Sequence, residues 1–599
     1  MLLEIFERKL VTCNFTHNFM KEHRLKQWKK DNCLDTLLFF ALRCRELIFD
    51  YTLDSFKYPA LNSTTICDEA LFLIDEIEEE NFTPKSIVPV LEELILKLRN
   101  DLVVKKLIGD DLKYYINFGD YSNLKEIRIK IEILHNKLSP INYINFLQED
   151  IKKLISENKE KRNIYELTTT YISTLINIGF SQTYIYSIIN KFFFSNNEVN
   201  DISILDSFFE SFHISRKKYR AIFKASELYE EIAQSSKVFD ITIIDKLEDE
   251  ILALDKKNFL KSKNRNERFL IMDDIFAFDP VSAKNSADEL INKLSNLFVF
   301  FHHKTQPNWS NNALIISESD DAILVKDKTS AMTKTTDYLP KKAAIKFNNL
   351  IRKLKLNEHS FTKYNRVIEL HGISVQNKII ENQLLQNWIA FETLLVGYEN
   401  TTKIDQVLKN LIPFLMIRYV RLQINELLRD INRFDKKFFY SQIKKIPEGD
   451  NLIEKFTAIL VLDKYKTNRI DFYQRLEFSP LNKYRLSQFH KIFSNVDELR
   501  NHIEKHRVKV EWQIKRMYRT RNLIVHAGVV PTFTESLVEN SHSYLDTLIS
   551  SINHLCINEN SIRSIEQGLK EIEIVYNKQK NILKEVKSID DNNFIKVLL

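Results

Sequence analysis

The chain has 599 residues, which is too long for one hydrophobic core and predicts roughly two to four domains. Hydrophobic residues make up 44%, a share typical of a folded chain rather than a disordered one. The net charge of +6 is small for this length, so nucleic-acid binding would require a local basic patch. No apolar run reaches the roughly 18 residues of a membrane span, and the first residues lack a signal peptide's apolar centre. We therefore expect a soluble, cytoplasmic protein without membrane contact.

Few glycines and scattered cysteines exclude the common cofactor motifs. Only eight glycines occur, and the closest two, Gly109 and Gly119, lie ten residues apart. A P-loop or a dinucleotide fingerprint needs several glycines close together. The five cysteines are scattered and include no C-x-x-C pair, so neither a disulfide framework nor a zinc site is indicated. We expect no cofactor.

Helical periodicity dominates residues 1–213, which we interpret as an N-terminal helical domain. Gly179 suits the position that follows a helix, and Ser181 suits the N-cap of the next one. No catalytic constellation occurs in this region, so we expect it to sense a signal or to contact a partner. The clearest apolar stripes cover residues 33–49, 90–98, 124–138 and 143–154.

Residues 214–335 change to short apolar runs bounded by polar residues, a pattern typical of strands. An amphipathic helix is expected between two of these runs, at residues 280–294. The alternation predicts a small α+β module. The expected strands are 269–272, 297–301, 313–316 and 322–325, with 219–223 as a possible further strand.

Histidine pairs suggest a metal site at two places. His302–His303 are adjacent, and His502 and His506 lie one helical turn apart. Neither pair has an obvious third ligand at the spacing that metal sites use. Asp273–Asp274 is more typical of a turn than of a metal-binding acid pair. We therefore expect no metal ion.

The pattern is helical again over residues 336–599, the third expected domain, so the fold class is mainly α. Pro340 marks its boundary. The expected helices cover residues 342–357, 375–397, 402–433, 451–462, 495–527, 533–556 and 560–588.

One charged segment of this domain stands out. Arg521 falls in the middle of an apolar helical stripe that includes Ile514, Met517, Ile524 and Val525. Asn522 and His526 lie one turn apart on the adjacent face, close to the helix end that Gly528 and Pro531 predict. A guanidinium, an amide and a titratable imidazole at one helix end indicate a site that handles phosphate.

The string from Arg516 to Gly528 resembles the R-x4-6-H signature of the HEPN superfamily, in the form seen in large Apea-like HEPN proteins of bacteria. Arg521, Asn522 and His526 carry the resemblance. Residues 386–395 resemble the first core helix of that domain. The resemblance implies a C-terminal HEPN-type helical bundle.

Glu392 occupies the centre of an apolar stripe in residues 386–395, as Arg521 does in the later helix. Two opposite charges on two apolar faces predict an ion pair between them. Such a pair would make Arg521 structural rather than catalytic, and both roles stay open at this point.

The resemblance implies a metal-independent endoribonuclease. A ribose 2′-hydroxyl attacks the adjacent phosphorus and leaves a 2′,3′-cyclic phosphate, with Arg521, Asn522 and His526 as the catalytic residues. Basic and aromatic side chains beside the motif are candidates for RNA contact. These candidates are Lys515, Arg516, Tyr518 and Arg519.

The same resemblance implies partners and a biological role. HEPN domains commonly pair about a two-fold axis, so we expect a homodimer. Large proteins of this type act as toxins or antiphage (abortive infection) effectors on tRNA or mRNA, and the N-terminal region would receive a phage-derived trigger or a co-encoded regulator. The alternative is a catalytically silent HEPN adaptor that binds RNA or a protein partner.

Overall fold

The computed structural model describes residues 28, 34–48, 61–119, 121–195, 199–319, 321–327, 332, 338–397, 400–557 and 562–599. The fold is mainly α with one small sheet, which confirms the expected fold class. The described residues form two compact units. Unit 1 comprises Met1–Ser173, Asn196–Ile202 and Ser330–Leu599, and unit 2 comprises Thr174–Ser195 and Ser203–Thr329.

This division differs from the expected three domains. The N-terminal helices up to residue 173 pack with the C-terminal helices in unit 1, and do not form a unit of their own. Helices between residues 174 and 213 pack with the sheet in unit 2. Periodicity detects helices but not their packing partners, so it does not predict which helices share a compact unit.

Unit 2 contains an antiparallel sheet with the strand order β2-β3-β1-β4-β5. An irregularity between Tyr219 and Ala221 shifts the register of β1 against β3. The expected strands near 219, 269, 313 and 322 are confirmed, whereas β2 was not anticipated. The strands are β1 (Lys217–Ser226), β2 (Ile241–Ile244), β3 (Glu267–Ala277), β4 (Ala313–Ser317) and β5 (Ala322–Val325).

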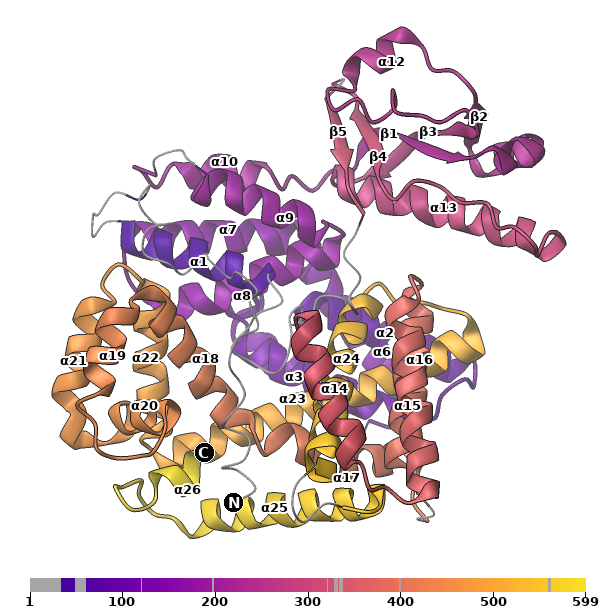
Figure 1. Ribbon diagram of the computed structural model, residues 1–599. Coiled ribbons are helices and arrows are strands. Elements are labelled where there is room, and N and C mark those ends of the chain that lie inside the picture. The colour runs from indigo at the N-terminus through magenta and orange to yellow at the C-terminus, as the bar shows by residue number, and fades with distance from the viewer. Residues whose placement is uncertain are drawn as a thin grey trace. The chain divides into compact units, whose positions relative to one another are not determined.

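Both faces of this sheet are covered by apolar side chains. Alternate residues of a strand point to opposite faces, so Ala221 and Phe223 of β1 face α13 (Pro280–Phe301) while Ile222 faces the other side. Helix α13 lies along one face of the sheet (Figure 1). The other helices of unit 2 are α9 (Gln182–Ile189), α10 (Ile204–Glu210), α11 (Ala233–Ser236) and α12 (Asp249–Leu254).

The expected strand at 297–301 is wrong, because these residues are the last turns of α13. A short apolar run does not distinguish a strand from a helix end. Asp279 caps this helix by accepting hydrogen bonds from the amides of Val281 and Ser282, and nothing before residue 301 breaks it. The expected N-cap at Ser181 is confirmed, since its hydroxyl accepts from the Tyr184 amide at 3.1 Å.

The C-terminal part of unit 1 contains two helical clusters. Helices α15, α16, α17, α23, α24 and α25 share one apolar core, and α18 to α22 share a second with α26. The expected helix at 402–433 is two helices, and α15, α19, α21 and α22 were not anticipated. The bounds are α14 (Pro340–Lys353), α15 (Glu358–Gln376), α16 (Ile380–Leu395), α17 (Lys403–Met416), α18 (Tyr419–Phe434), α19 (Lys436–Ile443), α20 (Leu452–Val461), α21 (Lys466–Arg475), α22 (Pro480–Phe493), α23 (Val496–Asn522), α24 (Thr534–Ile557), α25 (Ile565–Glu585) and α26 (Phe594–Leu598).

All four apolar stripes seen in the N-terminal part of the sequence lie on helices of unit 1, with residues 33 and 49 of the first stripe outside the described residues. The last turn of α8 belongs to unit 2. Their bounds are α1 (Asp35–Ile48), α2 (Ser63–Glu78), α3 (Val88–Asn100), α4 (Leu102–Ile108), α5 (Leu112–Tyr115), α6 (Leu124–Lys137), α7 (Pro140–Ser156) and α8 (Lys161–Ile178).

A buried ion network joins α2 and α3 to α23. Arg516 donates to Glu69 through Nε at 2.9 Å and through Nη2 at 2.7 Å, and Nη2 also donates to Glu93 at 2.7 Å. Arg519 donates to the other oxygen of Glu69 at 2.8 Å. All four side chains are buried. Burial alone would raise the pKa of Glu69, but the two guanidinium groups hold it below its usual value.

We predict that Glu69→Ala destabilises unit 1 by about 3–5 kcal/mol, because it leaves buried guanidinium charge without its main partner. The measurement is the thermal unfolding midpoint. The matched control is Glu92→Ala on α3, an exposed glutamate whose loss should change stability by less than about 0.5 kcal/mol. Equal midpoints for the two variants would contradict a stabilising role for the network.

Candidate functional site

The end of α23 has an unusual backbone. The α-helix stops at Asn522, and Leu523–Ala527 form a π-helical turn. Gly528 follows with φ of 66°, in the left-handed region, and its amide donates to the Leu523 carbonyl. This arrangement matches the helix end expected at Gly528, but the π turn was not anticipated. Single π turns occur often at functional sites.

Two of the three motif side chains at this helix end contact each other. Arg521 Nη1 donates to Asn522 Oδ1 at 3.0 Å, and both residues are half-buried. The buried Nε of Arg521 has no hydrogen-bond partner among the described residues. His526 is exposed on the π turn. The site therefore combines a held guanidinium, its amide partner and an accessible imidazole within one helix end.

The expected ion pair between Glu392 and Arg521 does not form. Glu392 instead accepts from Trp388 Nε1, one turn earlier on α16, at 2.7 Å, and from Lys403 Nζ at 3.5 Å. The buried face of α16 contains Trp388 and Phe391, whereas Ile389 is 38% exposed. The stripe drawn from the sequence was therefore rotated, and Glu392 lies beside the buried face rather than at its centre.

Two of the four candidates for RNA contact are buried. Arg516 and Arg519 are 2% and 7% exposed and are held by the buried ion network, so both predictions are corrected. Lys515 is half-buried and donates to Glu511 at 2.7 Å. The ring of half-buried Tyr518 packs 5.4 Å from the ring of Trp388. These side chains mainly hold α23 in position within unit 1.

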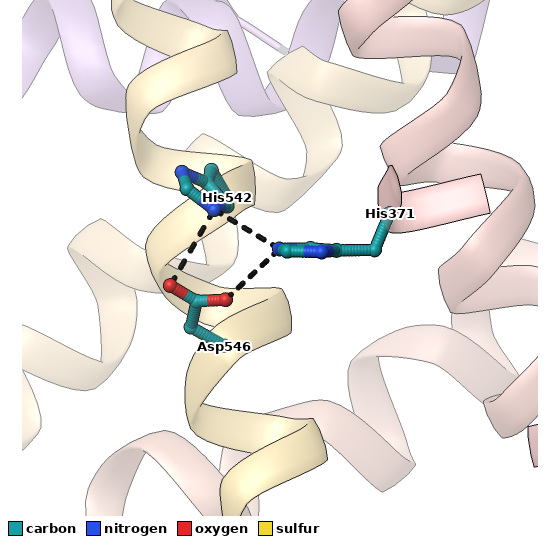
Figure 2. A group of neighbouring side chains, drawn as sticks. All are labelled: His371, His542 and Asp546. Atoms are coloured by element: carbon teal, nitrogen blue, oxygen red, sulfur yellow. Dashed lines mark hydrogen bonds and ion pairs between the residues drawn. The ribbon is translucent and has the colours of Figure 1, made fainter. Parts of the chain in front are cut away.

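A second group of functional side chains was missed in the sequence. His371 of α15 and His542 of α24 bring their Nε2 atoms to 3.1 Å from each other. The carboxylate of Asp546 lies 3.2 Å from Nε2 of His371 and 3.4 Å from Nε2 of His542. Figure 2 shows the three side chains pointing toward one point from the two helices. Only this group, among the described residues, has the geometry to hold a metal ion.

One part of this group was visible in the sequence. His542 and Asp546 are four residues apart, which places them one turn apart on the same helix face. The third member, His371, lies on a different helix and far away in the chain, so no spacing rule connects it to them. The histidine pair His502 and His506 instead packs against Tyr419, whose ring stacks 3.7 Å from that of His506.

No family model, curated protein or solved structure matches the chain. In the described part of the chain, no helix has both the length and the apolar character that crossing a bilayer requires.

We predict that Gly528→Ala loosens the turn that carries His526. A left-handed backbone costs an alanine about 1–2 kcal/mol, whereas asparagine tolerates this conformation better. Amide hydrogen exchange over residues 523–529 should be faster in Gly528→Ala than in the wild type, with Gly528→Asn in between. Unchanged exchange in the alanine variant would show that the glycine cap does not hold the turn.

Proposed function

We propose that this protein is a HEPN-type endoribonuclease whose site is Arg521, Asn522 and His526. One observation carries the proposal: a half-buried arginine is held by its neighbour Asn522 at the same helix end as an exposed histidine. A guanidinium binds phosphate oxygens well, and an imidazole is suited to proton transfer near neutral pH. The resemblance of Arg516–Gly528 to the HEPN signature supports the same chemistry.

The reaction follows from these groups. A base, assigned to His526, takes the proton of a ribose 2′-hydroxyl, and the oxygen attacks the adjacent phosphorus. The bond to the 5′-oxygen breaks, which leaves a 2′,3′-cyclic phosphate and a free 5′-hydroxyl. Negative charge grows on the equatorial oxygens in the transition state, and Arg521 is placed to stabilise it. DNA lacks the 2′-hydroxyl and is inert in this scheme.

The absence of the expected ion pair between Glu392 and Arg521 favours a catalytic role for Arg521 over a structural one. Its one hydrogen bond among the described residues goes to its own neighbour Asn522, so it ties no two helices together. The structural interpretation required a partner on another helix. Arg516 and Arg519, five and two residues before Arg521, supply that structural role instead through the buried network.

A homodimer completes the scheme. One histidine does not easily serve as base and as acid in the same turnover, whereas two copies of the motif in one cleft would divide these tasks. In line with the resemblance, the proposed activity is intracellular, on tRNA or mRNA, as a toxin or antiphage effector. In this proposal the helices before residue 174 receive the activating signal.

We predict that the wild type cleaves single-stranded RNA or tRNA in EDTA and leaves 2′,3′-cyclic phosphate ends. His526→Ala and Arg521→Ala should each reduce the rate by at least about 100-fold, the contribution usual for proton transfer or for charge stabilisation. End-labelled RNA separated on a denaturing gel gives the rate, and a 2′-deoxy substitution at the cleaved position gives the chemical control.

The melting midpoint separates a catalytic arginine from a structural one. Arg521→Ala should unfold near the wild-type temperature, because the hydrogen bond of Arg521 goes to the adjacent residue Asn522, whereas Arg516→Ala should unfold at a lower temperature. Cleavage by His526→Ala at the wild-type rate would exclude the proposed site. RNA binding without cleavage in every variant and in the wild type would favour the adaptor.

We also predict a dimer in solution. Sedimentation velocity of the full chain should give about twice the monomer mass of 71.1 kDa. A monomer that still cleaves RNA would show that one motif suffices.

A further inference from the structure

We propose that His371, His542 and Asp546 bind one divalent transition-metal ion of the Zn²⁺ type, which joins α15 to α24. Imidazole nitrogen and carboxylate oxygen are ligands that Zn²⁺ takes in proteins. The proposal goes beyond the ribonuclease activity, because none of these three residues belongs to the motif at Arg521.

The distances between the candidate ligand atoms fit a metal site. In a tetrahedral zinc site with bonds of about 2.0–2.1 Å, neighbouring ligand atoms lie about 3.3 Å apart. The two nitrogens are 3.1 Å apart, and the two nitrogen-to-oxygen distances are 3.2 and 3.4 Å. A single ion at the centre of these atoms would therefore reach ligands on both helices without a large movement.

Hydrogen bonds alone pair the donors and acceptors of these three side chains less completely than a bound cation would. If both Nε2 atoms carry hydrogen, each can donate to Asp546, but the two donors then face each other at 3.1 Å. If only one carries hydrogen, it can donate to the other nitrogen or to Asp546, but the second nitrogen and the carboxylate are then two acceptors that lie beside each other. A divalent cation accepts all the facing lone pairs at once and balances the charge of Asp546.

The burial of the group leaves one coordination position for water. The side chain of His542 is 3% exposed, whereas those of His371 and Asp546 are 27% and 39% exposed. The ion would thus rest on the buried histidine and face solvent on the other side. Three protein ligands with an open fourth position are the pattern of zinc sites that keep a bound water.

Such an ion would link distant parts of the chain. Helices α15 and α24 both contribute to the first apolar core of the C-terminal part of unit 1. In the chain, α24 is the next helix after the turn that ends the motif helix. Asn387 of α16, which packs between them, donates to Ser541, the residue before His542, at 3.0 Å. Binding of the ion would therefore stabilise the helices that support the ribonuclease motif.

The test uses the full, untagged chain, stripped with EDTA and exchanged into chelator-free buffer. Zn²⁺ is titrated by calorimetry, and Co²⁺ is titrated by the visible absorption of its tetrahedral complexes. We expect one ion per chain and a rise of the thermal midpoint on Zn²⁺ addition. His371→Ala and Asp546→Asn should each weaken binding by about 100-fold or more, since even outer-shell changes cost about 10–100-fold.

The matched control is His303→Ala, which removes an exposed histidine from unit 2 and should bind Zn²⁺ like the wild type. The two variants are at partly exposed ligands so that the fold should survive, and their circular-dichroism spectra should match that of the wild type. No uptake by the wild type, or equal uptake by His371→Ala, would overturn the proposal. RNA cleavage in EDTA is measured separately, so each proposal can fail without the other.

Discussion

The buried ion network of Glu69, Glu93, Arg516 and Arg519 is the constraint on which the rest of unit 1 depends. It places two negative and two positive side chains in the interior, where each charge needs the others. Because its members come from α2, α3 and α23, the N-terminal helices cannot separate from the motif helix without exposing or orphaning these charges. The helices of the N-terminal region up to Ser173 are therefore part of the same folded unit as the motif helix.

The network also explains why two of the cations that precede the motif, Arg516 and Arg519, lie in the interior. Arg516 and Arg519 hold α23 in place, and the free end of the helix carries Arg521, Asn522 and His526. The buried residues fix the position of the helix, and the π turn with Gly528 sets where the imidazole lies. Through Glu69 and Glu93, α2 and α3 contact the same helix that carries the motif.

The two candidate sites differ in how their residues are brought together. The motif at Arg521 is continuous in sequence, so a helical wheel was enough to find it. The group at His371, His542 and Asp546 needs two helices to pack, and only His542 and Asp546 share a helical face. The predicted ion pair between Arg521 and Glu392 was wrong for a related reason. The carboxylate of Glu392 instead accepts a hydrogen bond from Trp388 on the same helix, at 2.7 Å.

Local patterns in the sequence determined the mainly helical fold, the approximate bounds of several helices, four of the strands, the cap at Ser181 and the end of the motif helix. These features depend on period, capping residues and glycine, which act over a few residues. Tertiary structure alone decided which charges are buried and which helices share a unit. It also brought His371 to His542. Such contacts join residues far apart in the chain, and the free energy that selects them comes from packing and desolvation, which periodicity does not record.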